Sequence, residues 1–349
     1  SRAYRVSSRL LLLLTFACCT THSTACAEAQ IPEVRVQWQA HRGGGKTDAP
    51  ENTMAAFQHT WKLGGIPEAD IHTTSDGVII CLHDQSLART TNAPSEVRRR
   101  NVKSLLFDDI RQWDAGIKFD PKFKGERVPS LKEVFRAMQR DEGRQVYLDI
   151  KAVDLGQLGD LIDAFGVNKQ VLIASPRQSD CQTLKKLTYG IRTMLWIGGS
   201  ARDIKRRFAA VAASGFAGLD QVQLHLHDAK VGSTFRYELG RQFLIETLDT
   251  CHKSGVDLEV FLITFDKDSL QLLLDIGIRW YATDQPRRFA QMVDEWQKTS
   301  YVRSESPAES PEHPASESEA VLDTGGFESA AVDELPMNWR EFRAGGKPS

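Results

Sequence analysis

The stretch that decides the fold is residues 67–72, Pro67-Glu68-Ala69-Asp70-Ile71-His72. Its two carboxylates are two residues apart, so on a β-strand both point to one face. There they repel each other unless a cation or a proton lies between them. The following Asp76-Gly77 predicts a tight turn, and the apolar residues 78–82 predict a returning strand that ends at His83-Asp84. This local geometry brings two carboxylates and a histidine together, and it predicts the chemical centre.

The composition of the 349-residue chain limits the classes of partner and site. Its formal net charge of -2 gives no electrostatic case for a nucleic-acid partner. Three of the six cysteines lie near the amino terminus, and the others, Cys81, Cys181 and Cys251, have no CxxC spacing. We therefore expect neither a zinc site nor a disulfide framework. These three cysteines are predicted to be buried as small hydrophobic side chains.

The amino terminus predicts an export signal. Arginines at positions 2, 5 and 9 precede the apolar run 10–17, and Ala25-Cys26-Ala27 offers a small-residue cleavage site. The apolar run is shorter than the roughly 20 residues that a membrane-spanning helix needs, so no span is expected in the mature chain. We predict that residues 1–30 are a signal peptide and that the protein is exported, either periplasmic or secreted. A lipoprotein acylated on Cys18 is the alternative.

Residues 300–349 differ in character from the rest of the chain. Residues 304–319 are rich in Ser, Glu and Pro and nearly free of large apolar side chains. Such a segment cannot bury enough apolar surface to offset the entropy lost on ordering. We predict a disordered tail, with a short docking element around Trp339 as the alternative.

The central residues 31–299 are close in number to the about 250 residues of a (β/α)₈ barrel. Amphipathic helix patterns lie between most of eight apolar runs. Asn52 is expected to cap the first helix, and Ser130-Leu131-Lys132-Glu133 is a capping box. Alternating strands and helices predict a parallel sheet, and eight strands favour a closed TIM barrel over an open doubly wound sheet. The eight expected strands are residues 34–40, 68–72, 146–150, 171–175, 191–197, 222–226, 258–264 and 280–283.

Polar residues follow the carboxyl ends of these expected strands, where TIM barrels carry their catalytic groups. The first strand ends at His41-Arg42-Gly43-Gly44, and the second carries Glu68 and Asp70. The third ends at Asp149-Ile150-Lys151, and the eighth ends at Thr283-Asp284-Gln285-Pro286. Their convergence on one rim favours an active site over a merely solvated rim.

With these motifs the chain resembles the glycerophosphodiester phosphodiesterases. The resemblance covers about residues 36–296 and depends on the order and spacing of motifs that are individually weak. The motifs are His41-Arg42-Gly43, Pro50-Glu51-Asn52-Thr53, Glu68-Ala69-Asp70, Asp76-Gly77, His83-Asp84, Leu87-Ala88-Arg89-Thr90-Thr91, Val128-Pro129-Ser130-Leu131, Asp149-Ile150-Lys151 and Thr283-Asp284-Gln285-Pro286.

The resemblance implies a TIM barrel that uses a divalent cation to hydrolyse glycerophosphodiesters to sn-glycerol 3-phosphate and an alcohol. An all-oxygen ligand set suits Ca²⁺ or Mg²⁺ rather than zinc. Two histidines can share the proton transfers, but the sequence does not say which is the acid and which the base. By motif, the metal ligands would be Glu68, Asp70 and Asp149, the acid/base pair His41 and His83, the phosphate contacts Arg42 and Lys151, and the supporting residues Glu51, Asn52, Asp84 and Asp284.

The chain departs from the family pattern at two places. The family usually has Glu where Asp149 stands, so the third ligand arm is one methylene shorter, and an irregular shell in an exported protein favours Ca²⁺. On the seventh strand the family tends to carry Trp-Thr-Val-Asn, where this chain has Ile263-Thr264-Phe265-Asp266, so the loss of that aromatic residue is expected to affect the substrate pocket and not the chemistry. His225 and His227 of the sixth strand are expected to be structural, with a place at the mouth as the alternative.

Two other functions stay open. A phospholipase D-like member of the same superfamily, acting on lipid head groups, would use similar residues. A catalytically inactive barrel could bind a phosphodiester or a partner protein, but such a barrel would be free to lose His41, His83, Glu68 and Asp70, all of which are present. The head group, the oligomeric state and the purpose of the tail are open as well.

The composition of the tail generates a testable prediction. Deleting residues 301–349 should leave the melting temperature and the hydrolysis of glycerophosphodiesters nearly unchanged, because a disordered segment adds no buried contacts. Calorimetry and an activity assay on the full and shortened chains measure both. A large drop in melting temperature would show that the region around Trp339 docks on the barrel.

Overall fold

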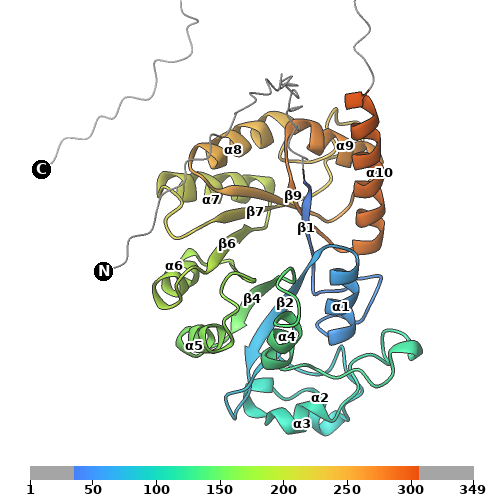
Figure 1. Cartoon of the computed structure of the whole chain (residues 1–349), viewed down its shortest axis with the longest axis vertical. Coiled ribbons are helices and arrows are strands. Elements are labelled where there is room, and N and C mark those ends of the chain that lie inside the picture. The colour runs from blue at the N-terminus through green and yellow to red at the C-terminus, as the bar shows by residue number, and fades with distance from the viewer. Residues whose placement is uncertain (1–34, 306–349) are drawn as a thin grey trace, which may run out of the picture. The chain divides into compact units, whose positions relative to one another are not determined.

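Eight parallel strands close into a barrel in the computed structural model, which describes residues 35–305 (Figure 1). Closure is direct, because β1 pairs with β9 on one side and with β2 on the other. The predicted TIM barrel is therefore confirmed. The barrel strands are β1 (Gln37–Ala40), β2 (Ile66–Thr73), β4 (Val146–Ala152), β5 (Val171–Ser175), β6 (Arg192–Ile197), β7 (Gln221–Leu226), β8 (Asp257–Leu262) and β9 (Trp280–Thr283).

Helices follow the strands and cover the outside of the barrel (Figure 1). Capping explains where several begin. The expected capping box of Ser130 and Glu133 opens α4, and the glycine after α9, Gly277, ends that helix at a positive φ of 105°. The outer helices are α1 (Met54–Lys62), α4 (Leu131–Met138), α5 (Leu155–Phe165), α6 (Gln178–Leu187), α7 (Ala201–Ala213), α8 (Arg241–Lys253), α9 (Lys267–Ile276) and α10 (Pro286–Glu305).

The hairpin predicted after the second strand is present. β3 (Ile79–Cys81) pairs antiparallel with β2, and Gly77 occupies the turn with a φ of 78°. Between β3 and α4 the chain forms a small lobe over its own apolar cluster, which includes Leu87, Val102 and Ile110. The short helices of this lobe are α2 (Ser95–Arg98), η1 (Val102–Ser104), α3 (Phe107–Arg111) and η2 (Pro121–Phe123).

One expected helix cap is wrong. The N-cap of α1 is Thr53, whose side chain accepts a hydrogen bond from the backbone N–H of Ala56. Asn52 instead adopts a left-handed φ of 55°, which turns its side chain away from the helix and toward β2. The residue expected to cap the helix is thereby available to the strand that carries Glu68 and Asp70.

The boundaries of the folded part differ slightly from those expected. The last helix, α10, continues to Glu305, beyond residue 299, where the folded part was expected to end. The helix thus extends past the apolar residues from which its length was predicted. A deletion that spares this helix therefore begins at Ser306. The predicted signal segment, residues 1–30, and residues 306–349 of the predicted tail lie outside the described residues. Among the helices of residues 35–305, none is long and apolar enough to cross a bilayer.

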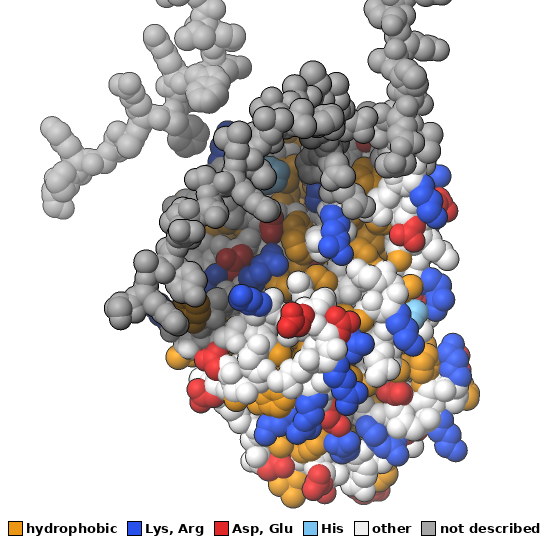
Figure 2. Space-filling view, in the orientation of Figure 1, with side chains coloured by type: hydrophobic (Ala, Val, Ile, Leu, Met, Phe, Trp, Pro, Cys, Tyr) orange, Lys and Arg blue, Asp and Glu red, His pale blue; other side chains and the backbone are white. Residues whose placement is uncertain are grey.

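The described surface and the cysteines agree with the composition. Both basic and acidic side chains lie on the visible face (Figure 2). Cys81, Cys181 and Cys251 are buried and free, as predicted.

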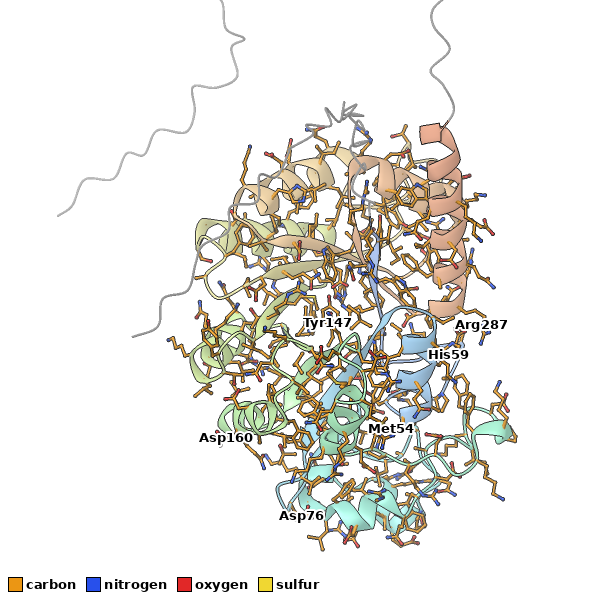
Figure 3. The ribbon with its side chains drawn as sticks, viewed as in Figure 1. Met54, His59, Asp76, Tyr147, Asp160 and Arg287 are labelled. Atoms are coloured by element: carbon orange, nitrogen blue, oxygen red, sulfur yellow. The ribbon has the colours of Figure 1, made fainter. Side chains whose placement is uncertain are left out.

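The inside of the barrel is partly polar below its carboxyl rim. Tyr147 lies inside the ring of strands (Figure 3) and donates a hydrogen bond to Gln221 Oε1 at 2.8 Å. The carboxylate of Glu259 on β8 is fully buried and accepts hydrogen bonds at Oε2 from Gln39 at 2.8 Å and Gln223 at 3.0 Å. Burial raises the pKa of Glu259 to about 8, which keeps this carboxyl group protonated at neutral pH.

This buried carboxyl group makes stability depend on pH. In the unfolded chain Glu259 loses its proton near 4.5, but in the folded barrel only near 8, so the free energy of unfolding falls as pH rises through that interval. The slope from this one group is about 1.4 kcal/mol per pH unit at most. Glu259→Gln keeps the shape and removes the titration, so the variant should gain stability over the wild type from pH 5 to pH 8. Denaturant unfolding at several pH values measures the difference, and a constant difference would contradict the assignment.

Candidate active site

Three carboxylates meet at the carboxyl end of the barrel. Glu68 and Asp70 share one face of β2, and the parallel register sets Asp70 opposite Asp149 on β4. One carboxylate oxygen from each residue lies within 4.8 Å of the others. The exposed fractions are only 4% for Glu68, 0% for Asp70 and 8% for Asp149, so water screens their mutual repulsion poorly.

Two neighbouring residues hold the β2 carboxylates in place. The backbone N–H of Arg42 donates to Glu68 Oε2 at 2.6 Å. The Asn52 side chain forms two hydrogen bonds with Asp70: its Nδ2 donates to Oδ2 at 2.8 Å, and its Oδ1 accepts from the Asp70 backbone N–H at 2.9 Å. The left-handed backbone at Arg42 and Asn52 aims both groups at β2.

The carboxylate cluster has the character of a cation site. Glu68 Oε1 is buried and has no hydrogen-bond partner among the described residues. Burial and the nearby charges of Asp70 and Asp149 raise the pKa of Glu68 well above its usual value. Carboxylate oxygens are the ligands that Ca²⁺ and Mg²⁺ prefer, so these three residues fit such an ion.

Lys151 supplies a positive charge beside these acids. Its Nζ lies 2.5 Å from Asp149 Oδ2 and 3.0 Å from Asp70 Oδ1, although the angle at Asp70 is unfavourable for a hydrogen bond. The ammonium group offsets part of the negative charge of the cluster. It also lines a cavity at the carboxyl end of the barrel, which Glu68 and Asp149 line as well. It therefore lies where an anionic group entering the cavity would meet it.

Two histidines face the cavity, and each is paired with an aspartate. His41, after β1, contacts Asp284 Oδ1 through Nδ1 at 2.8 Å, and His83, after β3, contacts Asp84 Oδ1 through Nδ1 at 2.8 Å. An aspartate on Nδ1 fixes the ring and leaves Nε2 as the working nitrogen. Sequence reasoning predicted all four residues, and the structure brings them together as two separate pairs.

Arg42 has a different position from the one expected of a phosphate contact. It is not among the residues that line the cavity. Its guanidinium group donates to Glu51 at 3.2 and 3.3 Å, and its Nε lies 3.8 Å from Asp70 Oδ2. In this arrangement the side chain braces Glu51, while the backbone N–H of Arg42 supports Glu68.

Arg89 connects the supporting acids, a role that sequence reasoning did not assign. It donates two hydrogen bonds of 2.6 Å to Glu51 and bonds of 2.8 and 2.9 Å to Asp84. These bonds lower the pKa of Asp84 to about 2 and hold its carboxylate against the His83 ring. The only signal in the sequence was the place of Arg89 in a family motif just after His83-Asp84.

The cavity beside these groups has a volume of about 160 Å³ and an aromatic side. Trp196, His225 and Phe261 form this aromatic wall. The cavity thus has aromatic rings although the seventh-strand motif lacks the tryptophan usual in the family pattern, because β6, β7 and β8 supply rings from other positions. His225 lies at the cavity, the alternative considered for it, whereas His227 is not among the lining residues. Burial lowers the pKa of His225 to about 4, so its ring is neutral.

Fold and site together define a TIM-barrel protein whose carboxyl rim carries three clustered carboxylates and two histidines. The model of the glycerophosphoryl diester phosphodiesterase family matches residues 41–288. A glycerophosphodiester phosphodiesterase of Caldanaerobacter subterraneus is 30% identical over 264 residues, which cover 73% of this chain and 96% of that protein. The chain belongs to the glycerophosphoryl diester phosphodiesterase family.

Solved structures share the fold at lower sequence identity. A glycerophosphodiester phosphodiesterase from Agrobacterium tumefaciens is similar with a TM-score of 0.58 and 23% identity, covering 73% of this chain and 99% of that one. A phosphodiesterase from Oleispira antarctica, solved in complex with the product sn-glycerol-3-phosphate, has a TM-score of 0.57 and 19% identity, covering 74% of this chain and 96% of that one.

The Arg89 contacts generate a prediction about turnover. Arg89→Lys removes the planar fork that bridges Glu51 and Asp84, so His83 should lose its fixed orientation. We expect kcat for a glycerophosphodiester to fall by about 10- to 100-fold, because small misplacements of catalytic groups slow the chemical step. Steady-state kinetics measure the change.

Arg236→Lys is the matched control for this variant. Arg236 also bridges two aspartates, Asp228 and Asp266, but it does not line the cavity. Its loss should leave kcat unchanged. Equal kcat values for Arg89→Lys and the wild type would show that Asp84 holds His83 unaided.

Proposed function

We propose that this protein hydrolyses glycerophosphodiesters to sn-glycerol 3-phosphate and an alcohol with a divalent cation and two histidines. The observation that carries this proposal is the buried cluster of Glu68, Asp70 and Asp149, with the unpartnered Glu68 Oε1, beside a cavity that both histidines line. Family membership supports the reaction class, and the Oleispira antarctica complex shows that product bound to a protein of the same fold.

Glu68, Asp70 and Asp149 would hold the cation. The ion would neutralise charge on the phosphate and polarise its P–O bonds. Ca²⁺ would suit these residues better than Mg²⁺, because Ca²⁺ tolerates irregular oxygen shells and the arm of Asp149 is short. Lys151 adds a fixed positive charge at the cavity for the phosphate oxygens. Arg42 contacts Glu51 through Nη1 alone, so its Nη2 would be available to a phosphate oxygen.

The histidines would carry out the two proton transfers. As the attacking oxygen forms its bond to phosphorus, the Nε2 of one histidine accepts its proton. As the bond from phosphorus to the alcohol oxygen breaks, the other histidine donates a proton to that oxygen. Asp284 and Asp84 stabilise the positive charge on whichever ring is protonated, since each lies 2.8 Å from an Nδ1.

The predicted export of the protein belongs to this proposal as well. The pattern of residues 1–30 supports it: arginines, then an apolar run, then a small-residue cleavage site. A periplasmic or secreted location would expose the enzyme to free Ca²⁺ and to glycerophosphodiesters released from lipids.

A panel of head groups with glycerol 3-phosphate as the readout tests the proposed reaction. Glycerophosphocholine and related diesters should yield glycerol 3-phosphate, and a chelator should abolish the yield until Ca²⁺ or Mg²⁺ is restored. His41→Ala and His83→Ala should each lower kcat by about 10²- to 10⁴-fold. Choline release from lysophosphatidylcholine without turnover of glycerophosphocholine would favour the phospholipase D-like function. No turnover of any diester would favour the inactive barrel.

His59→Ala is the matched control for the histidine variants. His59 on α1 also pairs with an aspartate, Asp48, at 3.2 Å, and it lies on the outer side of the barrel near Arg287 (Figure 3). His59 does not line the cavity, so the kcat of the His59→Ala enzyme should equal that of the wild type. A folded His83→Ala enzyme with the kcat of the His59→Ala control would remove His83 from the mechanism.

A further inference from the structure

The carboxylate of Asp149 is held by two donors, one at each of its oxygens. Lys151 Nζ lies 2.5 Å from Oδ2, and the indole Nε1–H of Trp196 donates to Oδ1 at 3.0 Å. Lys151 shares the β4 strand with Asp149, but Trp196 comes from β6, two strands away in the barrel. Of the three acids in the cluster, Asp149 is the one that bonds to an aromatic side chain.

The aromatic wall fixes the position of this indole. The ring of Trp196 stacks on His225 with a centroid distance of 5.5 Å and an interplanar angle of 11°. On its other side His225 packs edge-on against Phe261 at 5.1 Å. A side-chain carbon at Gly198 would lie 2.7 Å from His225 Nδ1, so the glycine leaves the imidazole the space that it occupies. The indole N–H is therefore aimed at Asp149 by packing that does not involve the cation.

Asp149 needs such support more than a longer acid would. Its carboxylate extends one methylene less far from its strand than that of Glu68 does, so fewer orientations bring an oxygen toward Glu68 and Asp70. Partners outside the coordination shell commonly orient the ligating groups, and their loss weakens metal binding by about 10- to 100-fold. The Trp196 indole is placed to act in this way.

We propose that Trp196 is a positioning residue that orients the Asp149 carboxylate for the divalent cation and so compensates for the shorter acid. This inference rests on the proposed function, since it requires that Glu68, Asp70 and Asp149 bind the ion. A Trp196 that served only as a wall for the substrate would not affect metal affinity when no substrate is present. Direct measurement of metal binding therefore separates the two roles.

The decisive variant is Trp196→Phe, which keeps an aromatic ring on His225 and removes the N–H donor. Calorimetric titration of the metal-free protein with Ca²⁺, and separately with Mg²⁺, is done without substrate. We expect the dissociation constant to rise by about 10- to 100-fold relative to the wild type. Trp280→Phe is the matched control, because Trp280 also hydrogen-bonds an aspartate, Asp257, but at the amino-terminal start of β8 and β9. Its dissociation constant should equal that of the wild type.

A second background tests the compensation. In Asp149→Glu the longer arm should reach the ion with less help, so adding Trp196→Phe should weaken Ca²⁺ binding by less than it does beside Asp149. Equal dissociation constants for the wild type and Trp196→Phe would overturn the inference, even if hydrolysis slows, and would leave Trp196 a wall residue. A wild-type protein that binds neither ion would instead overturn the proposed cation site itself.

Discussion

The repulsion among three buried carboxylates is the constraint on which the rest of the site depends. Parallel pairing of β2 and β4 sets Asp70 opposite Asp149, and Glu68, two residues before Asp70, lies on the same face of β2. Bringing such groups together out of water is unfavourable unless positive charge or hydrogen bonds balance them. Here Lys151, the Asn52 amide and the Arg42 backbone N–H supply part of that balance. The unpartnered Glu68 Oε1 marks the place where a cation would supply the remainder.

The barrel contributes rigidity, and the residues just beyond it contribute chemistry. His41 follows β1, whereas His83 follows the short strand β3, which is not a barrel strand and pairs antiparallel with β2. The hairpin thus carries a histidine over the carboxylates of the strand that precedes it. His72 on β2 supports this arrangement by contacting the backbone carbonyl of His83 at 3.2 Å. Ring position is then set locally by the aspartate on each Nδ1.

The departures of this chain from its family become understandable as packing. Asp149, where the resemblance implies a glutamate, meets an indole N–H, and the rings of Trp196, His225 and Phe261 line the cavity although the resemblance implies a further aromatic residue on the seventh strand. Phe265, from the segment that differs, packs instead against Phe289 of α10, outside the barrel. The aromatic surface of the pocket is therefore present: Phe261 supplies a ring from another position of the seventh barrel strand, and Trp196 and His225 supply rings from the two strands before it.

The sequence by itself determined the features that arise within short segments. These are the alternation of strands and helices, the β2–β3 hairpin, the shared face of Glu68 and Asp70, and the His83–Asp84 pair. Only the tertiary structure decided that Asn52, 18 residues away, holds Asp70 rather than capping α1, and that Arg89 joins Glu51 to Asp84. It also decided that Trp196, 47 residues from Asp149, donates to that carboxylate. The physical reason is that side-chain periodicity within a strand follows from backbone geometry alone. Contacts between distant segments depend instead on strand register and packing, which no single segment encodes.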